Sequence, residues 1–437
     1  MKIIYFFLFF LFSSASLYAE EANKQTKSST EIEVVQSRNY KKPYKEVFKA
    51  TLSVLQDNKY EIKFTDLNTN QYFYITLVII IFIVLVLFTW IFSKLNLKDR
   101  SCNKLKIYWP TLTNMSYLNG PSSNEVSNVK ADARPLFDVS DCKLLNFNVK
   151  SSYNCCCGDG YKNNFVALCA LEKSIANGCR FLDFEVYSYN NIPIIAASTA
   201  NNNFIKETYN SLLLENVLAT IKEKAFNGTS TNCANDPLIL NFRVMSTNLT
   251  MLKEMGELIE KYLSSSTQSF TLETKKDTAL LNVRMRDLYR KVIIICDFNP
   301  RSTIVDSNPE LKKLRKYINL KAKGTHCNTF RYNQIVSKKG SASFLTQAKS
   351  KYIIVLPNLD TSIINFDFTT PLLLGCQAIC MKHQNIDNNL LGYNRKFAER
   401  NYSWIKKTNA LLNKDMPELT NYTGTGVVYD EWGELTS

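Results

Sequence analysis

The chain has 437 residues, of which 45% are hydrophobic and 21% charged, so it can bury the core of a globular protein of two or three domains. Its formal net charge of +14 favours anionic partners. No nucleic-acid-binding motif is visible, so membrane phospholipids are the expected partners and nucleic acid is not. A Lys- and Asn-rich source proteome would give the same charge without any partner.

Residues 1–19 have the layout of a signal peptide. Lys2 precedes ten apolar residues from Ile3 to Phe12, and Ala19 stands before the acidic Glu20. The apolar run is too short to span a bilayer, so we expect cleavage after residue 19. An uncleaved anchor is the alternative.

Residues 20–70 are expected to form a small α+β module. Apolar residues alternate at Ile32 and Val34 and again from Tyr60 to Phe64, which indicates strands, and helical spacing connects Tyr44 to Leu55. About fifty residues bury little surface, so this module should be only marginally stable.

A transmembrane helix is predicted at residues 72–92, where 21 consecutive residues from Tyr72 to Phe92 carry no charge. At 1.5 Å per residue such a helix matches the hydrocarbon core of a bilayer, about 30 Å thick. Basic residues follow it closely, at Lys94, Lys98, Arg100, Lys104 and Lys106. The positive-inside rule therefore predicts a single-pass membrane protein with its C-terminal part in the cytoplasm. Glycosylation triplets argue for the opposite side, and they begin at Asn114, Asn227, Asn248, Asn401 and Asn421.

The twelve cysteines show no regular spacing. Adjacent side chains diverge, so the run from Cys155 to Cys157 does not suit a metal ion. Four others lie in apolar runs and are expected to be free, buried thiols, which favours a reducing compartment: Cys169, Cys179, Cys296 and Cys376.

Residues 107–407 alternate between short apolar strands and longer helices, and residues 408–437 form a C-terminal tail. Helices are predicted at 166–176, 212–226 and 249–263, and strands at 180–186, 192–196, 237–243, 292–297, 352–356 and 376–381. This order predicts an α/β fold with a largely parallel sheet, closed into a TIM-type (β/α)8 barrel. The barrel would follow the transmembrane helix and the N-terminal α+β module.

Four short motifs follow one another in this alternating part. Residues 151–154 read Ser-Ser-Tyr-Asn, 178–185 Gly-Cys-Arg-Phe-Leu-Asp-Phe-Glu, 237–240 Pro-Leu-Ile-Leu and 375–377 Gly-Cys-Gln. In this order they resemble the Ser-Ser-His-Asn, Gly-Cys-Arg…Glu-Leu-Asp, Pro-Val-Ile-Leu and Gly-Cys-Gln motifs of phosphoinositide-specific phospholipase C. The resemblance covers about residues 147–407 and implies the catalytic X/Y barrel of a PLC-like phosphodiesterase.

The resemblance also implies two catalytic histidines, but both positions are degenerate. Tyr153 and Ala197 stand where the histidines are expected. Tyrosine titrates near 10 and is a poor base at neutral pH, and alanine cannot transfer a proton. We therefore expect no catalytic residue at these positions.

The implied calcium site is only partly kept. Asn154, Asp183 and Glu185 occupy three ligand positions, but Arg243 stands where a fourth carboxylate is required. A guanidinium repels calcium and can pair with both carboxylates through hydrogen bonds. We expect an ion pair of Arg243 with Asp183 or Glu185, no metal and no cofactor, with calcium only if an active enzyme is present.

Three functions stay open on the sequence. The first is a catalytically inactive, membrane-anchored barrel that acts as a scaffold or lipid-surface binding module. The second is an active phosphoric diester hydrolase of lipid metabolism with a rearranged site, for which His383 after the last strand is a candidate base. The third is a structural membrane protein, for example of a viral envelope.

Overall fold

The computed structural model describes residues 69–95, 97–105, 142–200, 205–264, 269–298, 304–398 and 403–412. The predicted signal peptide, nearly all of the α+β module and most of the C-terminal tail lie outside these residues. Contacts within the chain divide it into two units at Ile83, and the second unit, Val84–Ser437, contains the barrel.

The helix α3 (Thr69–Leu95) covers the predicted span and has 27 residues. The side chains from Tyr72 to Phe92 are exposed. By length and composition α3 could cross a membrane, and within the described residues no other helix meets these criteria.

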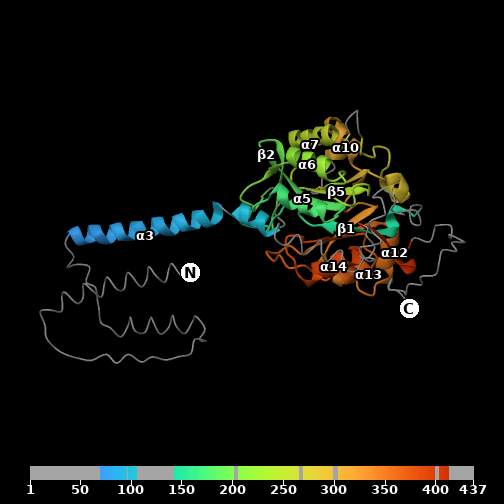
Figure 1. Cartoon of the computed structure of the whole chain (residues 1–437). Helices are drawn as coiled ribbons and strands as arrows, with labels where there is room; N and C mark the ends of the chain where they lie inside the picture. The colour runs from blue at the N-terminus through green and yellow to red at the C-terminus, as the bar shows by residue number, and fades with distance from the viewer. Residues whose placement is uncertain are drawn as a thin grey trace, which may run out of the picture. The chain divides into compact units, whose positions relative to one another are not determined.

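Eight parallel strands follow one another around a barrel in chain order, and the last of them, β10, returns to pair with β1 (Figure 1). They are β1 (Phe147–Ser152), β2 (Phe181–Tyr189), β5 (Leu238–Val244), β6 (Val292–Phe298), β7 (Leu320–Lys321), β8 (Cys327–Arg331), β9 (Tyr352–Leu356) and β10 (Ala378–Met381). Most apolar side chains of these strands form the main core and are fully buried. Alternate residues of β9 and β10 belong instead to a second cluster with residues of the helices that follow β8, β9 and β10.

The barrel is nearly closed, which corrects the prediction of a closed barrel. The sheet ends at β7 on one side and at β8 on the other. Strand β7 has only two residues, and the chain turns at once into β8, with Gly324 N donating to Cys327 O at 2.9 Å. A two-residue strand already paired with β6 offers too little backbone for a second ladder.

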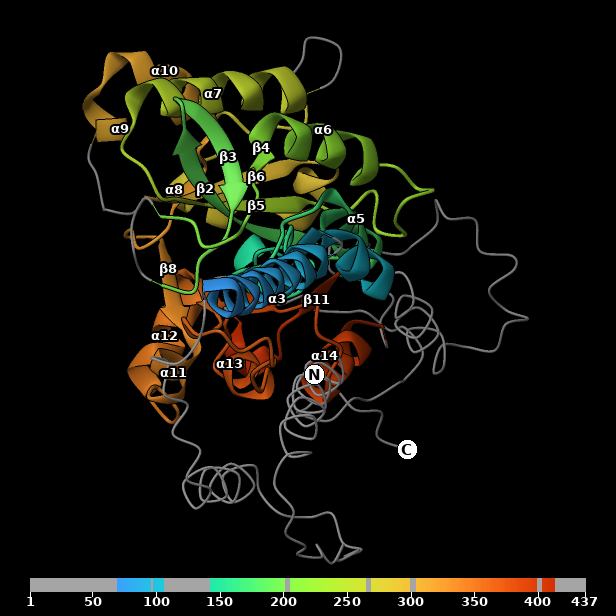
Figure 2. The ribbon, with the colours of Figure 1, turned by 90° about the vertical axis from the view of Figure 1, so that its left-hand side faces the viewer.

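Three further strands lie outside the ring: β3 (Ile192–Ala196), β4 (Leu212–Leu213) and β11 (Trp404–Lys406). Strand β3 runs antiparallel beside β2, as Figure 2 shows. The turn between them contains Asn190 and Asn191 at φ of 48° and 65°, a left-handed conformation that asparagine tolerates and that suits tight hairpins.

Helices surround the barrel, with α6, α7 and α10 on one side and α12, α13 and α14 on the other (Figure 1). Their bounds are α5 (Leu168–Ala176), α6 (Leu214–Lys224), α7 (Leu249–Leu263), α8 (Asp277–Leu281), α9 (Ile304–Ser307), α10 (Lys312–Tyr317), α11 (Tyr332–Val336), α12 (Ala342–Ser350), α13 (Thr369–Leu373) and α14 (Asn388–Ala398). Short 3-10 turns occur at Leu144–Asn146, Met285–Leu288, Pro309–Leu311 and Asn409–Leu411.

The predicted elements match the observed ones closely. Helix α7 and strands β3 and β9 have the predicted bounds, and no other predicted end differs by more than three residues. The strand expected from Cys376 begins at Ala378, because the Cys376 amide donates to Pro371 O at 3.1 Å in the turn after α13.

Candidate functional site

Strand register brings the acidic and basic residues together at the carboxyl end of the barrel. Asp183 and Glu185 alternate along β2 and share one face. On the neighbouring strand β5, Asn241 lies opposite Asp183 and Arg243 opposite Glu185. Asn154 follows the end of β1, at φ 40°.

The Arg243 guanidinium lies between the two carboxylates and the amide of Asn154. It binds Asp183 side-on, with Nε to Oδ1 at 3.0 Å and Nη2 to Oδ2 at 2.7 Å. Its Nη1 donates to Glu185 Oε1 at 2.7 Å, and Nη2 also donates to Asn154 Oδ1 at 2.8 Å. The exposed fractions are 2% for Arg243, 0% for Asp183 and 1% for Glu185. The structure thus places one cation between two buried anions.

The remaining donors complete the coordination of both carboxylates. Asp183 accepts from Asn241 Nδ2 at 2.7 Å and from Asn154 N at 3.1 Å. Glu185 accepts from Asn154 Nδ2 at 3.1 Å, and from Tyr187 Oη at 2.8 Å and Ser198 N at 2.9 Å. Each of the four carboxylate oxygens therefore accepts two hydrogen bonds.

Charge and burial act in opposite directions on Arg243. Burial disfavours the charged guanidinium, but Asp183, Tyr153 and Glu185 outweigh it and raise the pKa of Arg243 well above its usual value. The guanidinium carbon also lies 4.8 Å from the centroid of the Tyr153 ring, within range of a cation–π contact. This arginine is permanently charged at any physiological pH.

The two degenerate histidine positions both lie beside this cluster. Tyr153 is 2% exposed, and burial raises the pKa of its phenol above the ordinary value of 10. Arg331 Nη1 lies 3.4 Å from its oxygen. Ala197 is fully buried directly after β3, where its methyl group offers no proton.

Sequence reasoning missed four residues of this site: Asn241, Tyr187, Ser198 and Arg331. The first two lie two positions from Arg243 and Glu185 on the same strand faces, so strand alternation could have identified them. The contact of Arg331 with Tyr153 spans 178 residues, and no local pattern reveals it.

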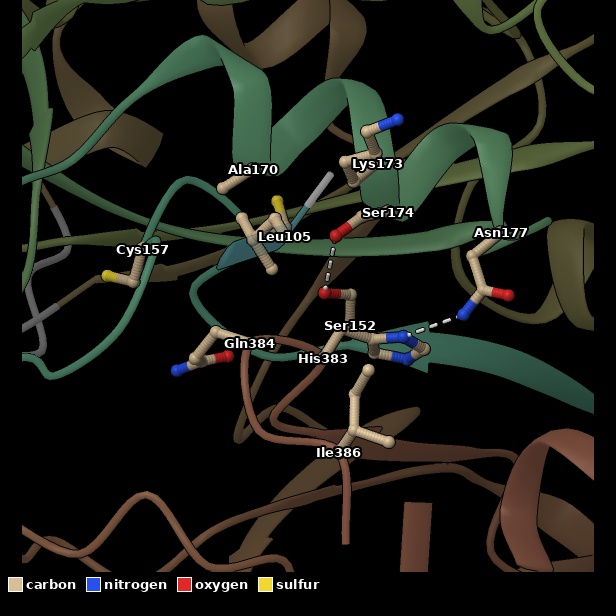
Figure 3. A pocket seen from close by; sticks show the side chains of 11 residues that line it. Leu105, Ser152, Cys157, Ala170, Lys173, Ser174, Asn177, His383, Gln384 and Ile386 are labelled. Carbon is tan, nitrogen blue, oxygen red and sulfur yellow. Dashed lines mark hydrogen bonds between the residues drawn. The ribbon is translucent and has the colours of Figure 1, made fainter. Parts of the chain in front are cut away.

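Neither histidine of the chain belongs to the cluster. His383 lines a small cavity of about 20 Å³ together with Ser152, Ser174 and Asn177, and its Nδ1 is 3.0 Å from Asn177 Nδ2 at the end of α5 (Figure 3). Burial lowers the pKa of His383 to about 3. His326 precedes β8, at the amino end of the strands and thus opposite the cluster.

Among the described residues, no group of three or more His, Cys, Asp or Glu side chains could hold a metal ion. The oxygens of the side chains that resemble calcium ligands accept hydrogen bonds from Arg243, from backbone amides and from the side chains of Asn154, Asn241 and Tyr187.

The free-thiol prediction is wrong for one of its four cysteines. Cys169 at the start of α5 forms a disulfide with Cys102. Cys179, Cys296 and Cys376 are free and fully buried, as expected. The local sequence pattern did not predict this disulfide, because the partner of Cys169 lies 67 residues away.

Comparison with solved structures identifies the fold. A crystal structure of S. officinalis PLC21 matches 68% of this chain and 41% of its own, with a TM-score of 0.51 and 14% identity. L. pealei PLC21 matches 64% and 38%, with a TM-score of 0.47 and 13% identity. A calcium-dependent phosphoinositol-specific phospholipase C from Pseudomonas sp matches 63% and 98%, with a TM-score of 0.37 and 12% identity. No family model and no curated protein matches the sequence.

The first of these structures carries the assignment. The chain has an α/β fold with a nearly closed parallel eight-stranded barrel, which resembles phospholipase C barrels at low identity. It spans less than half the length of the S. officinalis protein.

Proposed function

We propose that this chain is a membrane-anchored PLC-like barrel that does not hydrolyse phosphodiesters and acts as a scaffold or lipid-surface binding module. One observation carries the proposal: the Arg243 guanidinium lies 2.7 Å from both Asp183 and Glu185, among the side chains that resemble calcium ligands. A calcium ion takes six to eight oxygen ligands at about 2.3–2.6 Å. Here the carboxylate oxygens already accept two hydrogen bonds each.

The residues at the two histidine positions support the same proposal. General acid–base groups each contribute on the order of 10²–10⁴ to a rate. Tyr153 is buried with a raised pKa, and Ala197 has no titratable group. A rearranged hydrolase would need another base, and the ring of His383 is engaged with Asn177, 3.0 Å from its Nδ2 (Figure 3).

The membrane anchor rests on α3, with its exposed apolar side chains, and the phospholipid partner on the net charge of +14. A lipid-binding barrel and a purely structural membrane protein differ in their response to charge. Flotation of the detergent-purified chain with neutral and anionic vesicles separates them. Binding that requires anionic lipid and weakens with salt supports lipid recognition.

The test of inactivity is hydrolysis of phosphatidylinositol by the full chain in liposomes, with calcium or with a chelator. We expect no release of inositol phosphate in either condition. The matched control is the variant Arg243→Glu/Tyr153→His/Ala197→His, which places the missing groups on the same barrel. Calcium-dependent release by the natural chain would refute the proposal.

A further inference from the structure

The segment after α3 is docked on the barrel, and a disulfide fastens it there. Residues 97–105 are helical, with Ser101 and Leu105 buried. A Cβ at Gly158 would come within 2.9 Å of the Ser101 Cβ, so the helix sits directly on the loop after β1. Cys102 on this helix is bonded to Cys169 on α5, with their Cα atoms 6.0 Å apart.

This disulfide indicates whether the compartment is oxidising or reducing more directly than the free cysteines do. Ten described cysteines are free and all are buried, where a thiol packs as a small apolar group in any compartment. Disulfides, in contrast, form and persist in oxidising environments. They form by exchange, in which the two thiols lose two electrons and two protons and reduce the disulfide of a cellular oxidoreductase.

By the positive-inside rule, the basic residues at the end of α3 and after it favour the cytoplasmic side for the barrel, but two of them have a contact in the fold. Lys94 Nζ lies 5.5 Å from the centroid of the Tyr209 ring, and Lys104 pairs with Asp159 at 3.7 Å. A role in docking the helix explains these two charges without reference to topology.

A second observation comes from the triplet that begins at Asn227, in the exposed loop between α6 and β5. Asn227 Oδ1 accepts from Thr229 N at 3.0 Å and from Thr229 Oγ1 at 2.9 Å. Within the described part of the chain its Nδ2 has no partner, and a Cβ placed at Gly228 meets nothing within 4 Å. The amide nitrogen that would carry a glycan therefore belongs to an exposed side chain and makes no hydrogen bond to a described residue.

The triplet at Asn248 differs from that at Asn227, because the side-chain nitrogen of Asn248 has a hydrogen-bond partner. Asn248 caps α7, with Oδ1 accepting from Met251 N at 3.0 Å, and its Nδ2 donates to Asn191 Oδ1 at 2.7 Å. A glycan on this nitrogen would have to displace the hairpin turn between β2 and β3.

We propose that the barrel lies on the oxidising side of the membrane and that Asn227 is an N-glycosylation site, whereas Asn248 is not. In the modification, Asn227 Nδ2 forms a bond to the anomeric carbon of an oligosaccharide carried on a polyprenyl diphosphate. The bond from that carbon to the diphosphate oxygen breaks, the diphosphate leaves, and the amide loses one proton to the transferase. This inference is independent of whether the barrel catalyses a reaction.

The test is translation of the full chain with microsomes, followed by endoglycosidase digestion and gel electrophoresis. No acceptor triplet precedes α3, so any glycan reports the side of the barrel. Thr229→Ala and Asn227→Gln should each remove one step of mobility. Thr229→Ser, which keeps the triplet, and Asn248→Gln should leave the mobility unchanged.

In the same membranes, alkylation before and after reduction measures whether Cys102 and Cys169 form the disulfide. Cys102 and Cys169 should resist alkylation until a reductant is added, and Cys102→Ser should make Cys169 reactive. An unmodified chain with both thiols alkylated without reductant would overturn the proposal and support the cytoplasmic placement. A glycan on Asn248, or none on Asn227, would overturn the site assignment.

Discussion

At the residue scale, Arg243 is the cation on which two buried carboxylates depend. Its contacts with Asp183 and Glu185 exclude water, because all three side chains are at most 3% exposed. Removing one partner of a buried ion pair leaves an uncompensated charge and costs about 3–5 kcal/mol.

Arg243→Ala should therefore lower the free energy of unfolding by about 3–5 kcal/mol, measured by urea denaturation. The matched control is Lys261→Ala, which removes an exposed ion pair with Glu215 of similar length, 2.6 Å. An exposed pair contributes about 0–1 kcal/mol. Equal losses in the two variants would show that burial of the Arg243 cluster has no energetic consequence.

His383 gives the fold a pH dependence of known sign. Burial lowers the pKa of His383 to about 3, against about 6.5 in an unfolded chain. Between these values the unfolded state binds a proton that the folded state does not, so stability falls as the pH is lowered through this window. The contribution is at most about 1.4 kcal/mol per pH unit.

Unfolding free energies measured from pH 7 to pH 4 check this. His383→Gln should give a shallower loss of stability than the natural chain. A variant with the natural slope would show that His383 is not the residue that titrates.

The sequence predicts those residues of the cluster that lie on one face of a strand. Asp183, Glu185 and Arg243 follow from strand alternation and motif order, and Asn241 was accessible by the same rule. Contacts across the barrel were not accessible. The pairing of His383 with Asn177 spans 206 residues, so it depends on the closed path of the chain.

At the element scale, the register of β2 against β5 determines which side chains meet. A shift of β2 by one residue would turn Asp183 and Glu185 to the opposite face, away from Arg243. The apolar strands β3 and β9 and the amphipathic helix α7 were predicted with correct bounds. The two-residue β7 carries too little periodic signal, and β8 carries polar residues, so both were missed.

The packing of α7 against α10 depends on a residue without a side chain. A Cβ at Gly256 would lie 2.8 Å from the backbone nitrogen of Leu314, which cannot move away as a flexible side chain can. Alanine in a helix normally stabilises by about 1 kcal/mol over glycine. Here overpacking should prevail, and Gly256→Ala should destabilise the fold by about 1–3 kcal/mol.

Thermal unfolding of the Gly256→Ala variant, with Lys253→Ala as the control, measures this loss of stability. Lys253 is exposed on the same helix, so its replacement should change the stability little. A stabilised Gly256→Ala variant would mean that the two helices pack less closely than the structure indicates.

At the scale of the whole molecule, the chain combines a phospholipase C-like barrel with a site that differs in charge from the one the resemblance implies. The fold was predictable, because alternating strands and helices and four ordered motifs agree with it. The nearly closed seam between β7 and β8 and the Cys102–Cys169 disulfide were not, since both arise from contacts between separate segments.

The most direct test of the account is a calcium titration of the full chain in detergent micelles, followed by calorimetry. Because the Arg243 guanidinium lies between Asp183, Glu185 and Asn154, the account predicts no calcium binding at micromolar concentrations. Arg243→Glu, which removes the cation and adds a fourth ligand, should gain binding. Micromolar binding of calcium by the natural chain, unchanged in Arg243→Glu, would contradict the account.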